Sequence, residues 1–263
     1  MAEKSIFDLT GRVALVTGGG FGIGRSICDA LAEFGAHVIV ADLNEETAKE
    51  TTQLISRFGH RTMAIKVDVS NALEVQNMVD KTVSSFGTID IAVNNAGAII
   101  GRFKIHETPE ELWDRTMAIN LKGVFLCCKA EIPIMLKNKK GSIVNTASVG
   151  AILPGDPDMM GSIYDTAKAG IIAFSRKAAG EYGRDGIRVN AIAPGMITGT
   201  AFGADRKKTA PPNAVQKLQE RISKMALGRP GTADELKGIV VYLASDAASF
   251  ATGQVFVVDG GIS

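Results

Sequence analysis

The strongest constraint on the fold of this chain is a regular alternation of short β-branched segments with longer amphipathic ones. The short runs suit buried strands, and the intervening segments space their apolar residues as helices do. The expected strands cover residues 13–16, 37–41, 62–67, 89–93, 141–147, 187–192 and 254–258. The expected helices cover residues 23–34, 45–58, 73–86, 110–137, 162–182, 213–225 and 234–243, with Pro133 bending or dividing the fourth. This alternation predicts a parallel sheet, because each right-handed crossover lays a helix over it.

Length and composition fit one domain of this kind. The chain has 263 residues, of which 46% are apolar and 22% are charged, as in ordinary globular proteins. It contains no linker, internal repeat or low-complexity stretch. We therefore expect a single α/β domain over residues 1–263, with a Rossmann-type doubly wound parallel sheet and helices on both faces.

Charge and cysteine content argue against several classes of function. The formal net charge of +1 gives no field that favours nucleic acid or an anionic membrane. No apolar run approaches the ~20 residues of a membrane span, and the N-terminus lacks a secretory signal. Cys28, Cys127 and Cys128 match no disulfide or zinc pattern, so we expect them to pack inside helices and we expect no metal site. These features indicate a cytoplasmic protein without nucleic-acid or membrane partners.

A glycine-rich turn lies between the first expected strand and its helix. Glycines there let the backbone approach a pyrophosphate, whose charge is met by amides at the helix N-terminus. The glycine spacing is wider at its start than in the common GxGxxG pattern. The position of the turn predicts a dinucleotide phosphate site at Gly18, Phe21, Gly22, Ile23 and Gly24.

Asp42 ends the second expected strand, roughly 20 residues after the turn, where an acid can accept both hydroxyls of an adenosine ribose. A carboxylate there repels a 2′-phosphate, so we expect NAD rather than NADP. Arg25 is the one residue that could contest this interpretation, and Asp42 could instead be a cap or turn residue. Asp68 ends the third strand and is either an adenine contact or a turn former. Leu43 and Val69 follow the two acids and complete the expected adenosine site.

Tyr164 and Lys168 are four residues apart, which places them on one helix face. A phenol titrates at about 10, and a neighbouring ammonium stabilises the phenolate and lowers its pKa. Such a pair is also common on solvated helices. Ser148 after the preceding strand, Asn120 in the long helix and the nucleotide turn upstream favour a catalytic role.

Together these motifs resemble the classical short-chain dehydrogenase/reductase family, from about Leu9 to the C-terminus. The nucleotide motif of that family corresponds to Thr17, Gly18, Gly22, Ile23 and Gly24, its adenine-side aspartate to Asp68 and its strand-end motif to residues 94–97. Its catalytic tetrad corresponds to Asn120, Ser148, Tyr164 and Lys168, and its later motifs to Pro194-Gly195 and residues 258–261.

The resemblance implies a role for each member of the tetrad. Tyr164 would be the base in alcohol oxidation and the acid in ketone reduction, and Lys168 would hold the nicotinamide ribose and lower the tyrosine pKa. Ser148 would bind the substrate oxygen, and Asn120 would hold a water that links Lys168 to solvent. The further cofactor contacts implied are Asn95, Ala96, Gly97, Pro194, Gly195, Ile197, Thr198 and Thr200.

The resemblance also implies a substrate lid around residues 196–227 and a homotetramer, or a dimer, built on the helices expected at 110–137 and 162–182. Two departures from the family pattern bear on the site. The segment from Ser148 to Tyr164 is longer than usual, and Gly199 occupies the usual threonine position. Thr198 and Thr200 therefore both remain candidates for the cofactor contact.

We expect an NAD-dependent oxidoreductase that transfers a hydride between nicotinamide and a secondary alcohol or its ketone. One alternative is reduction of 3-oxoacyl thioesters of acyl carrier protein or CoA. That reaction usually uses NADPH, and Asp42 argues against it. The other alternative is a regulator that binds NAD(H) without catalysis, and the presence of both Tyr164 and Lys168 argues against it.

Overall fold

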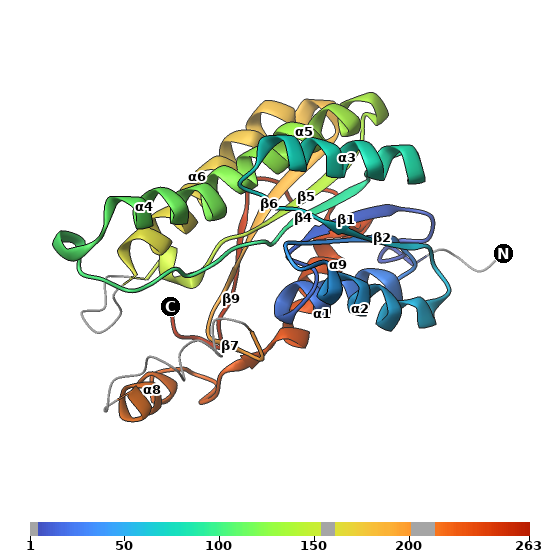
Figure 1. Cartoon of the computed structure of the whole chain (residues 1–263). Helices are drawn as coiled ribbons and strands as arrows, with labels where there is room; N and C mark the ends of the chain where they lie inside the picture. The colour runs from blue at the N-terminus through green and yellow to red at the C-terminus, as the bar shows by residue number, and fades with distance from the viewer. Residues whose placement is uncertain (1–4, 154–160, 201–213) are drawn as a thin grey trace.

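A parallel sheet between two layers of helices makes up the body of the molecule (Figure 1). The computed structural model describes residues 5–153, 161–200 and 214–263. Within these residues the main sheet has seven strands in the order β3-β2-β1-β4-β5-β6-β9, all parallel to their neighbours. The strands are β1 Val13–Thr17, β2 His37–Asp42, β3 Thr62–Lys66, β4 Ile91–Asn94, β5 Gly141–Thr146, β6 Ile187–Pro194 and β9 Val255–Val258. The doubly wound α/β sheet expected from the sequence is confirmed.

The strand order reverses between β1 and β4, which pair with each other in the middle of the sheet. From β1 the chain proceeds to β2 and β3 on one side, and from β4 it proceeds through β5 and β6 on the other. At such a reversal the loops that follow the two central strands diverge, and the crevice between them is where doubly wound sheets bind ligands. The segments after β1 and β4 therefore mark the place of a candidate site.

Helices cover both faces of the sheet. In Figure 1, α3, α4, α5 and α6 lie on one side, and α1, α2 and α9 lie on the other. The helices are α1 Gly22–Glu33, α2 Glu45–Ile55, α3 Ala72–Phe86, α4 Glu110–Met117, α5 Gly123–Asn138, α6 Ser162–Tyr182, α8 Ala214–Ser223 and α9 Lys237–Ala244. Since no described helix is long and apolar enough for the purpose, none of them is a candidate for crossing a membrane.

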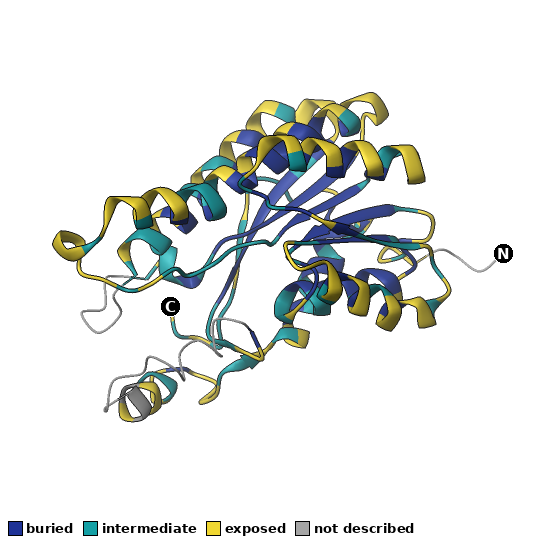
Figure 2. Cartoon of the chain, viewed as in Figure 1, coloured by how far each residue is buried: buried dark blue, intermediate teal, exposed yellow. Residues whose placement is uncertain are grey.

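Each face of the sheet has its own apolar core, because successive strand residues point to opposite faces. Leu15 packs into the core under α3, α5 and α6, and its neighbour Val16 packs into the core under α1, α2 and α9. The inner strands β2, β1, β4, β5 and β6 are accordingly buried between the two helix layers, whereas the edge strands β3 and β9 are partly exposed (Figure 2). The three cysteines are free and buried in these cores, as expected for packing residues.

The long helix expected over residues 110–137 is divided, but not at Pro133. A π turn at Ala118–Lys122 separates α4 from α5. The side chain of Asn120 donates to the carbonyl of Thr116 at 3.0 Å, and so occupies the acceptor that an α-helix would give to the Asn120 amide. Pro133 lies inside α5 without ending it, although its ring removes the amide that would bond to the carbonyl of the exposed Lys129.

Two smaller differences concern short elements. A two-stranded sheet joins β7 Ile197–Thr198 to β8 Gly231–Thr232, and neither strand was predicted, because two residues are too short to show a period. The helix expected over residues 234–243 is a short 3₁₀ turn at Ala233–Leu236 followed by α9.

Candidate active site

The glycine-rich turn after β1 is packed so closely that side chains cannot enter it. Gly18 and Gly22 have φ angles of +64° and +54°, which favour glycine. A Cβ atom at Gly24 would collide with the carbonyl oxygen of Gly18. Phe21, at the N-cap of α1, gives the helix no side-chain cap. The first amides of α1 therefore face a bare backbone cradle, which fits the pyrophosphate of a dinucleotide.

Asn95, which follows β4, holds this turn in place. Its Nδ2 donates to the carbonyl oxygens of Thr17 and Gly18, both at 3.3 Å. The amides of Asn95 and Ala96 donate in turn to the hydroxyl of Thr17, at 3.1 and 3.2 Å. The side chain of Asn95 thus positions the nucleotide turn by joining the ends of β1 and β4.

Asp42 lies beside the same turn. Its Oδ2 accepts from the amide of Gly20 at 2.9 Å, and its Oδ1 accepts from the amide of Asn44 at 3.0 Å. The carboxylate therefore serves the turn locally and also places negative charge next to the phosphate cradle. Leu43 is exposed beside it.

Arg25, the residue that could have bound a 2′-phosphate, is instead bound to groups of the protein. Its Nη2 and Nε donate to the carbonyl of Gly20 at 2.6 and 2.9 Å, and Nη2 pairs with Glu50 at 3.0 Å. The guanidinium is thus bound to the outside of the turn. Asp68 accepts from the amide and the hydroxyl of Ser70, at 2.9 and 2.7 Å, so at least one of its oxygens forms a local turn.

The four expected catalytic residues converge at the carboxyl ends of β4 and β5. Tyr164 and Lys168 come from α6, Ser148 follows β5, and Asn120 comes from the π turn. Ser148 is hydrogen-bonded to Tyr164, and the Lys168 Nζ lies 5.6 Å from the centroid of the Tyr164 ring. The structure therefore brings together four residues from three separate segments.

Gly97 lies where these groups meet. A Cβ atom there would be 2.7 Å from Oδ1 of Asn120 and 3.3 Å from Nζ of Lys168. Two hydrogen bonds to Ala98 fix the Asn120 side chain. Its Oδ1 accepts from the Ala98 amide at 3.1 Å, and its Nδ2 donates to the Ala98 carbonyl at 2.8 Å. The loop after β4 thus has close contact with the π turn and with the buried lysine.

Burial dominates the electrostatics of the tyrosine-lysine pair. It raises the pKa of Tyr164 above its usual value, with a further increase from Asp165, and the Ser148 hydrogen bond opposes this. Burial also lowers the pKa of Lys168 to about 7. The lysine has itself lost the solvent that would stabilise its charge, and the expectation that it lowers the pKa of Tyr164 stays a prediction.

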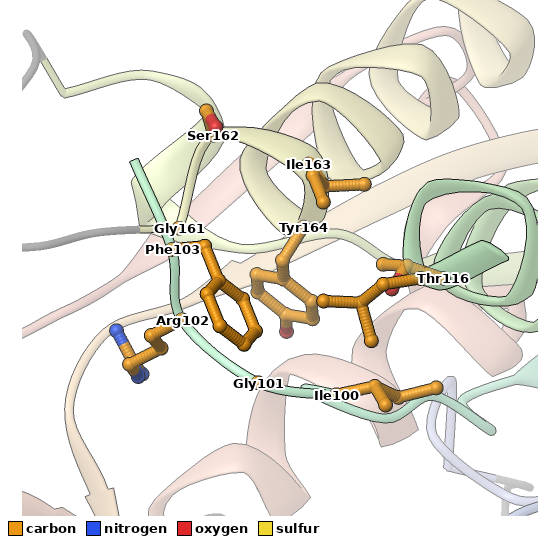
Figure 3. Close-up of a pocket in the computed structure, with 10 residues that line it drawn as sticks. Ile100, Gly101, Arg102, Phe103, Thr116, Gly161, Ser162, Ile163 and Tyr164 are labelled. Carbon is orange, nitrogen blue, oxygen red and sulfur yellow. The ribbon is translucent and has the colours of Figure 1, made fainter. Parts of the chain in front are cut away.

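A shallow pocket adjoins the tyrosine, and Figure 3 shows the ring of Phe103 beside that of Tyr164. It is lined by Ile100, Gly101, Arg102, Phe103, Leu112, Thr116, Gly161, Ser162, Ile163 and Tyr164. Arg102 points away from the phenol in this view, and its charge acts on Asp165. We did not predict Arg102, Phe103 or Asp165 as site residues. Their only sequence signal is position, shortly after the motif at 94–97 or next to Tyr164.

The segment after β6 closes over the nucleotide turn. The Cα of Thr200 would lie 3.3 Å from a Cβ at Gly22, whereas the Thr198 hydroxyl donates to the carbonyl of Gly231 at 3.1 Å. Of the two candidate threonines, Thr200 is therefore the one next to the turn. The amide of Gly195 donates to the carbonyl of Val258 at 2.9 Å, which ties the end of β6 to β9.

Other parts of the expected site are only partly described. Residues 201–213 of the expected lid and residues 154–160 of the long segment before Tyr164 lie outside the described residues. At the C-terminal end of the expected lid, the amides of Ala226 and Leu227 donate to the carbonyls of Gly261 and Gly260. Among the histidine, cysteine and acidic side chains that the structure describes, no group of three is placed to hold a metal ion.

Comparison with known proteins agrees with this geometry. A family model described as enoyl-(acyl carrier protein) reductase matches residues 19–263. The chain is 36% identical over 255 residues to a 2-(S)-hydroxypropyl-CoM dehydrogenase of Xanthobacter autotrophicus, covering 97% of this chain and 98% of that protein. It is 38% identical over 261 residues to a 3-oxoacyl-[acyl-carrier-protein] reductase of Synechocystis, with coverage of 97% and 98%. The solved structure of an NAD⁺-bound xylitol dehydrogenase matches with a TM-score of 0.90 and 31% identity, over 96% of this chain and 99% of that one.

Proposed function

Because the chain belongs to the short-chain dehydrogenase/reductase family, and so is an oxidoreductase of alcohols and ketones, we propose that it is an NAD-dependent dehydrogenase of a secondary alcohol. The observation that carries this proposal is the position of Asp42, whose carboxylate binds the glycine-rich turn through Gly20 at 2.9 Å. A 2′-phosphate beside that carboxylate would meet like charge. The tetrad Asn120, Ser148, Tyr164 and Lys168 supplies the chemistry.

The bound nicotinamide supplies the hydride acceptor or donor, and the protein supplies orientation and a proton path. Ser148, which is hydrogen-bonded to Tyr164, would hold the substrate oxygen beside the phenol. Tyr164 would accept the alcohol proton in oxidation and return it in ketone reduction. Lys168, which is buried beside Tyr164, would stabilise the phenolate when the lysine itself is protonated. Asn120, fixed by Ala98, would maintain the water path from Lys168 to solvent.

Two features support NAD over NADP. The first is Asp42 itself. The second is the state of Arg25, whose guanidinium is bound by the carbonyl of Gly20 and by Glu50. An arginine that recognises a 2′-phosphate must be able to present two N–H groups to it, and these contacts direct the guanidinium of Arg25 to other partners. The named xylitol dehydrogenase is an NAD⁺-bound relative.

For the rest of the cofactor site we propose contacts from the turn (Gly18, Phe21, Gly22, Ile23, Gly24), the adenosine side (Asp42, Leu43, Asp68, Val69), the loop after β4 (Asn95, Ala96, Gly97), the catalytic pair (Tyr164, Lys168) and the segment after β6 (Pro194, Gly195, Ile197, Thr198, Thr200). The reversal of strand order at β1 and β4 supports this set, because ligands of doubly wound sheets bind at the carboxyl ends of the strands where the order reverses. Thr200 is favoured over Thr198 because it lies against Gly22.

We further propose that residues 1–263 form one domain with a substrate lid around 196–227, and that the protein is a cytoplasmic homotetramer or dimer. The large exposed side chains of Trp113 on α4 and Phe125 on α5 support an interface there. Three free cysteines support a reducing compartment. The 3-oxoacyl thioester reductase stays the alternative activity, since a relative carries that name.

The deciding experiment is a titration of the purified protein with NADH and with NADPH, followed by NAD-linked turnover on a panel of secondary alcohols. Tighter NADH binding with turnover of one alcohol class supports the proposal. Tighter NADPH binding would overturn the Asp42 argument and favour the thioester reductase. NADH binding without turnover on any alcohol, ketone or 3-oxoacyl thioester would favour a regulator that binds NAD(H) without catalysis.

A further inference from the structure

A buried acid lies beneath the candidate site, on the side of the sheet covered by α5 and α6. Glu131 of α5 has no solvent-exposed surface. Its Oε2 accepts from Nδ2 of Asn94 at 3.1 Å, and its Oε1 has no hydrogen-bond partner. Among the residues that the structure describes, no cation acts on it. An ionised carboxylate in such a place is costly, so the surroundings favour a neutral acid.

Glu131 ends a chain of buried side chains that crosses two strands. Asn94 and Asn145 are register partners on β4 and β5, and Nδ2 of Asn94 donates to Oδ1 of Asn145 at 3.1 Å. Nδ2 of Asn145 donates to the hydroxyl of Ser175 on α6 at 3.0 Å. We name Glu131, Asn94, Asn145 and Ser175 the buried bridge. It links α5 to α6 through the carboxyl ends of β4 and β5.

The residues next to the bridge in sequence are those that shape the site. Asn95 follows Asn94 and holds the nucleotide turn through the carbonyls of Thr17 and Gly18. Thr146 follows Asn145, and its carbonyl accepts from Nζ of Lys168 at 2.7 Å. The Thr146 hydroxyl also lies 3.4 Å from Oδ1 of Asn95. Because successive side chains of a strand point to opposite faces, Asn94 and Asn145 can anchor the strand ends inside the core. The residue that follows each of them is then free to contact the nucleotide turn or Lys168.

The protonation of Glu131 decides how many partners the bridge can satisfy. Oε1 of Glu131 and Oδ1 of Asn94 are both buried acceptors without a donor, and a carboxylic acid adds one donor to this group. Burial raises the pKa of Glu131 to about 7, and the Asn94 hydrogen bond opposes the rise. The titratable groups that face it are Cys127 and Cys128 of its own helix, whose thiols are kept neutral by burial.

We propose that Glu131 is a positioning residue, which as a neutral acid holds the buried bridge and through it the nucleotide turn and Lys168. This inference rests on the proposed function, because cofactor binding is its readout. It predicts that Glu131→Gln preserves the buried bridge, because an amide keeps a donor and an acceptor and does not titrate. It also predicts that an apolar side chain of similar size does not.

The test measures the NADH dissociation constant of wild type, Glu131→Gln and Glu131→Leu between pH 6 and pH 8.5, together with the melting temperature. Thr82→Val is the matched control. Thr82 is also fully buried, but its hydroxyl bonds only to its own helix, at the carbonyl of Met78. At pH 6 we expect Glu131→Gln within about two-fold of wild type, Glu131→Leu weaker by about ten-fold or more, and Thr82→Val unchanged. Wild type is expected to lose several-fold more affinity toward pH 8.5 than Glu131→Gln.

The outcomes separate the two proposals. If wild type binds neither NADH nor NADPH, the proposed function fails and this inference falls with it. If wild type binds NADH and all variants share its affinity and pH profile, only the inference fails. Weak binding by Glu131→Gln, equal to that of Glu131→Leu, would also overturn it, because it would mean that the charge is needed. If Glu131→Leu does not fold, the pH profiles of wild type and Glu131→Gln decide alone.

Discussion

Nζ of Lys168 lies 2.7 Å from the carbonyl oxygen of Thr146, in a site where the lysine is almost completely buried. A carbonyl is a good acceptor, but it does not replace the water that stabilises an ammonium. The pKa of Lys168 accordingly falls to about 7. The lysine can therefore gain or lose its proton near neutral pH, which suits a group that serves a proton path.

The stability of the free protein should depend on Lys168 between pH 7 and pH 10. Below pH 7 both the folded and the unfolded chain hold the proton, so the folded state bears the full cost of the buried charge. Between about 7 and the usual lysine value only the unfolded chain holds it, so stability rises with pH. Urea unfolding should show wild type gaining roughly 3–5 kcal/mol over Lys168→Met across this range. The exposed Lys177→Met on the same helix is the control, and a constant gap between wild type and Lys168→Met would contradict the assignment.

Replacing the phenol should separate binding from chemistry. Tyr164→Phe removes the proton donor and acceptor but keeps the ring beside Phe103. We expect NADH binding to change by less than about two-fold and turnover to fall by about 10²–10⁴-fold. Tyr182→Phe at the end of the same helix should leave both unchanged. Near-normal turnover in Tyr164→Phe would remove the tetrad from the mechanism.

Cofactor choice should respond to Asp42 and to the restraint on Arg25. Asp42→Ala removes the charge that repels a 2′-phosphate, and we expect the ratio of NADPH to NADH dissociation constants to fall by about ten-fold. Glu50→Gln alone should change the ratio little, because Asp42 remains. The double variant Asp42→Ala with Glu50→Gln should show the largest fall in this ratio, because it also removes the carboxylate charge that pairs with Arg25. An unchanged ratio in Asp42→Ala would show that the acid is not at the ribose.

The nucleotide turn should not tolerate one added methyl group. In Gly24→Ala the new Cβ would collide with the carbonyl of Gly18 and lie 2.8 Å from Nδ2 of Asn95. We expect NADH affinity to fall by more than about ten-fold, because the amide cradle must open. Gly238→Ala on α9 meets open space and should match or slightly exceed wild-type stability, by up to about 1 kcal/mol. Calorimetry and NADH titration of both variants make the comparison.

How far the sequence predicts this molecule depends on the range of the interactions involved. The strands and helices follow from local periodicity, and the catalytic pair from a four-residue spacing on one helix. The adjacent Asn94 and Asn95 show the limit. Their letters are identical, yet one side chain enters the buried bridge and the other holds the nucleotide turn. Only the register of β4 against its neighbours assigns them.

Arg25 and Lys168 show the same limit for charge. From the sequence, Arg25 is a cation near a phosphate site and Lys168 is an ammonium near a phenol. In the structure the first is bound outside the turn by Glu50, and the second is almost completely buried. Both outcomes depend on partners distant in sequence or on depth, which spacing along the chain does not encode.

The π turn at Ala118–Lys122 has a consequence for length variation in this protein. A π turn holds one residue more than the α-helical path around it, and each α-helical residue turns the chain by about 100°. Deleting one residue from this turn would therefore yield a regular helix that keeps the faces of α4 and α5 in register, whereas the same deletion inside α5 would rotate the rest of that helix by this angle and carry its apolar residues off the sheet. Within the α4–α5 segment this turn is thus the place where a one-residue gap disturbs the packing least, but such a gap would remove the widened turn from which the side chain of Asn120 reaches the carbonyls of Thr116 and Ala98.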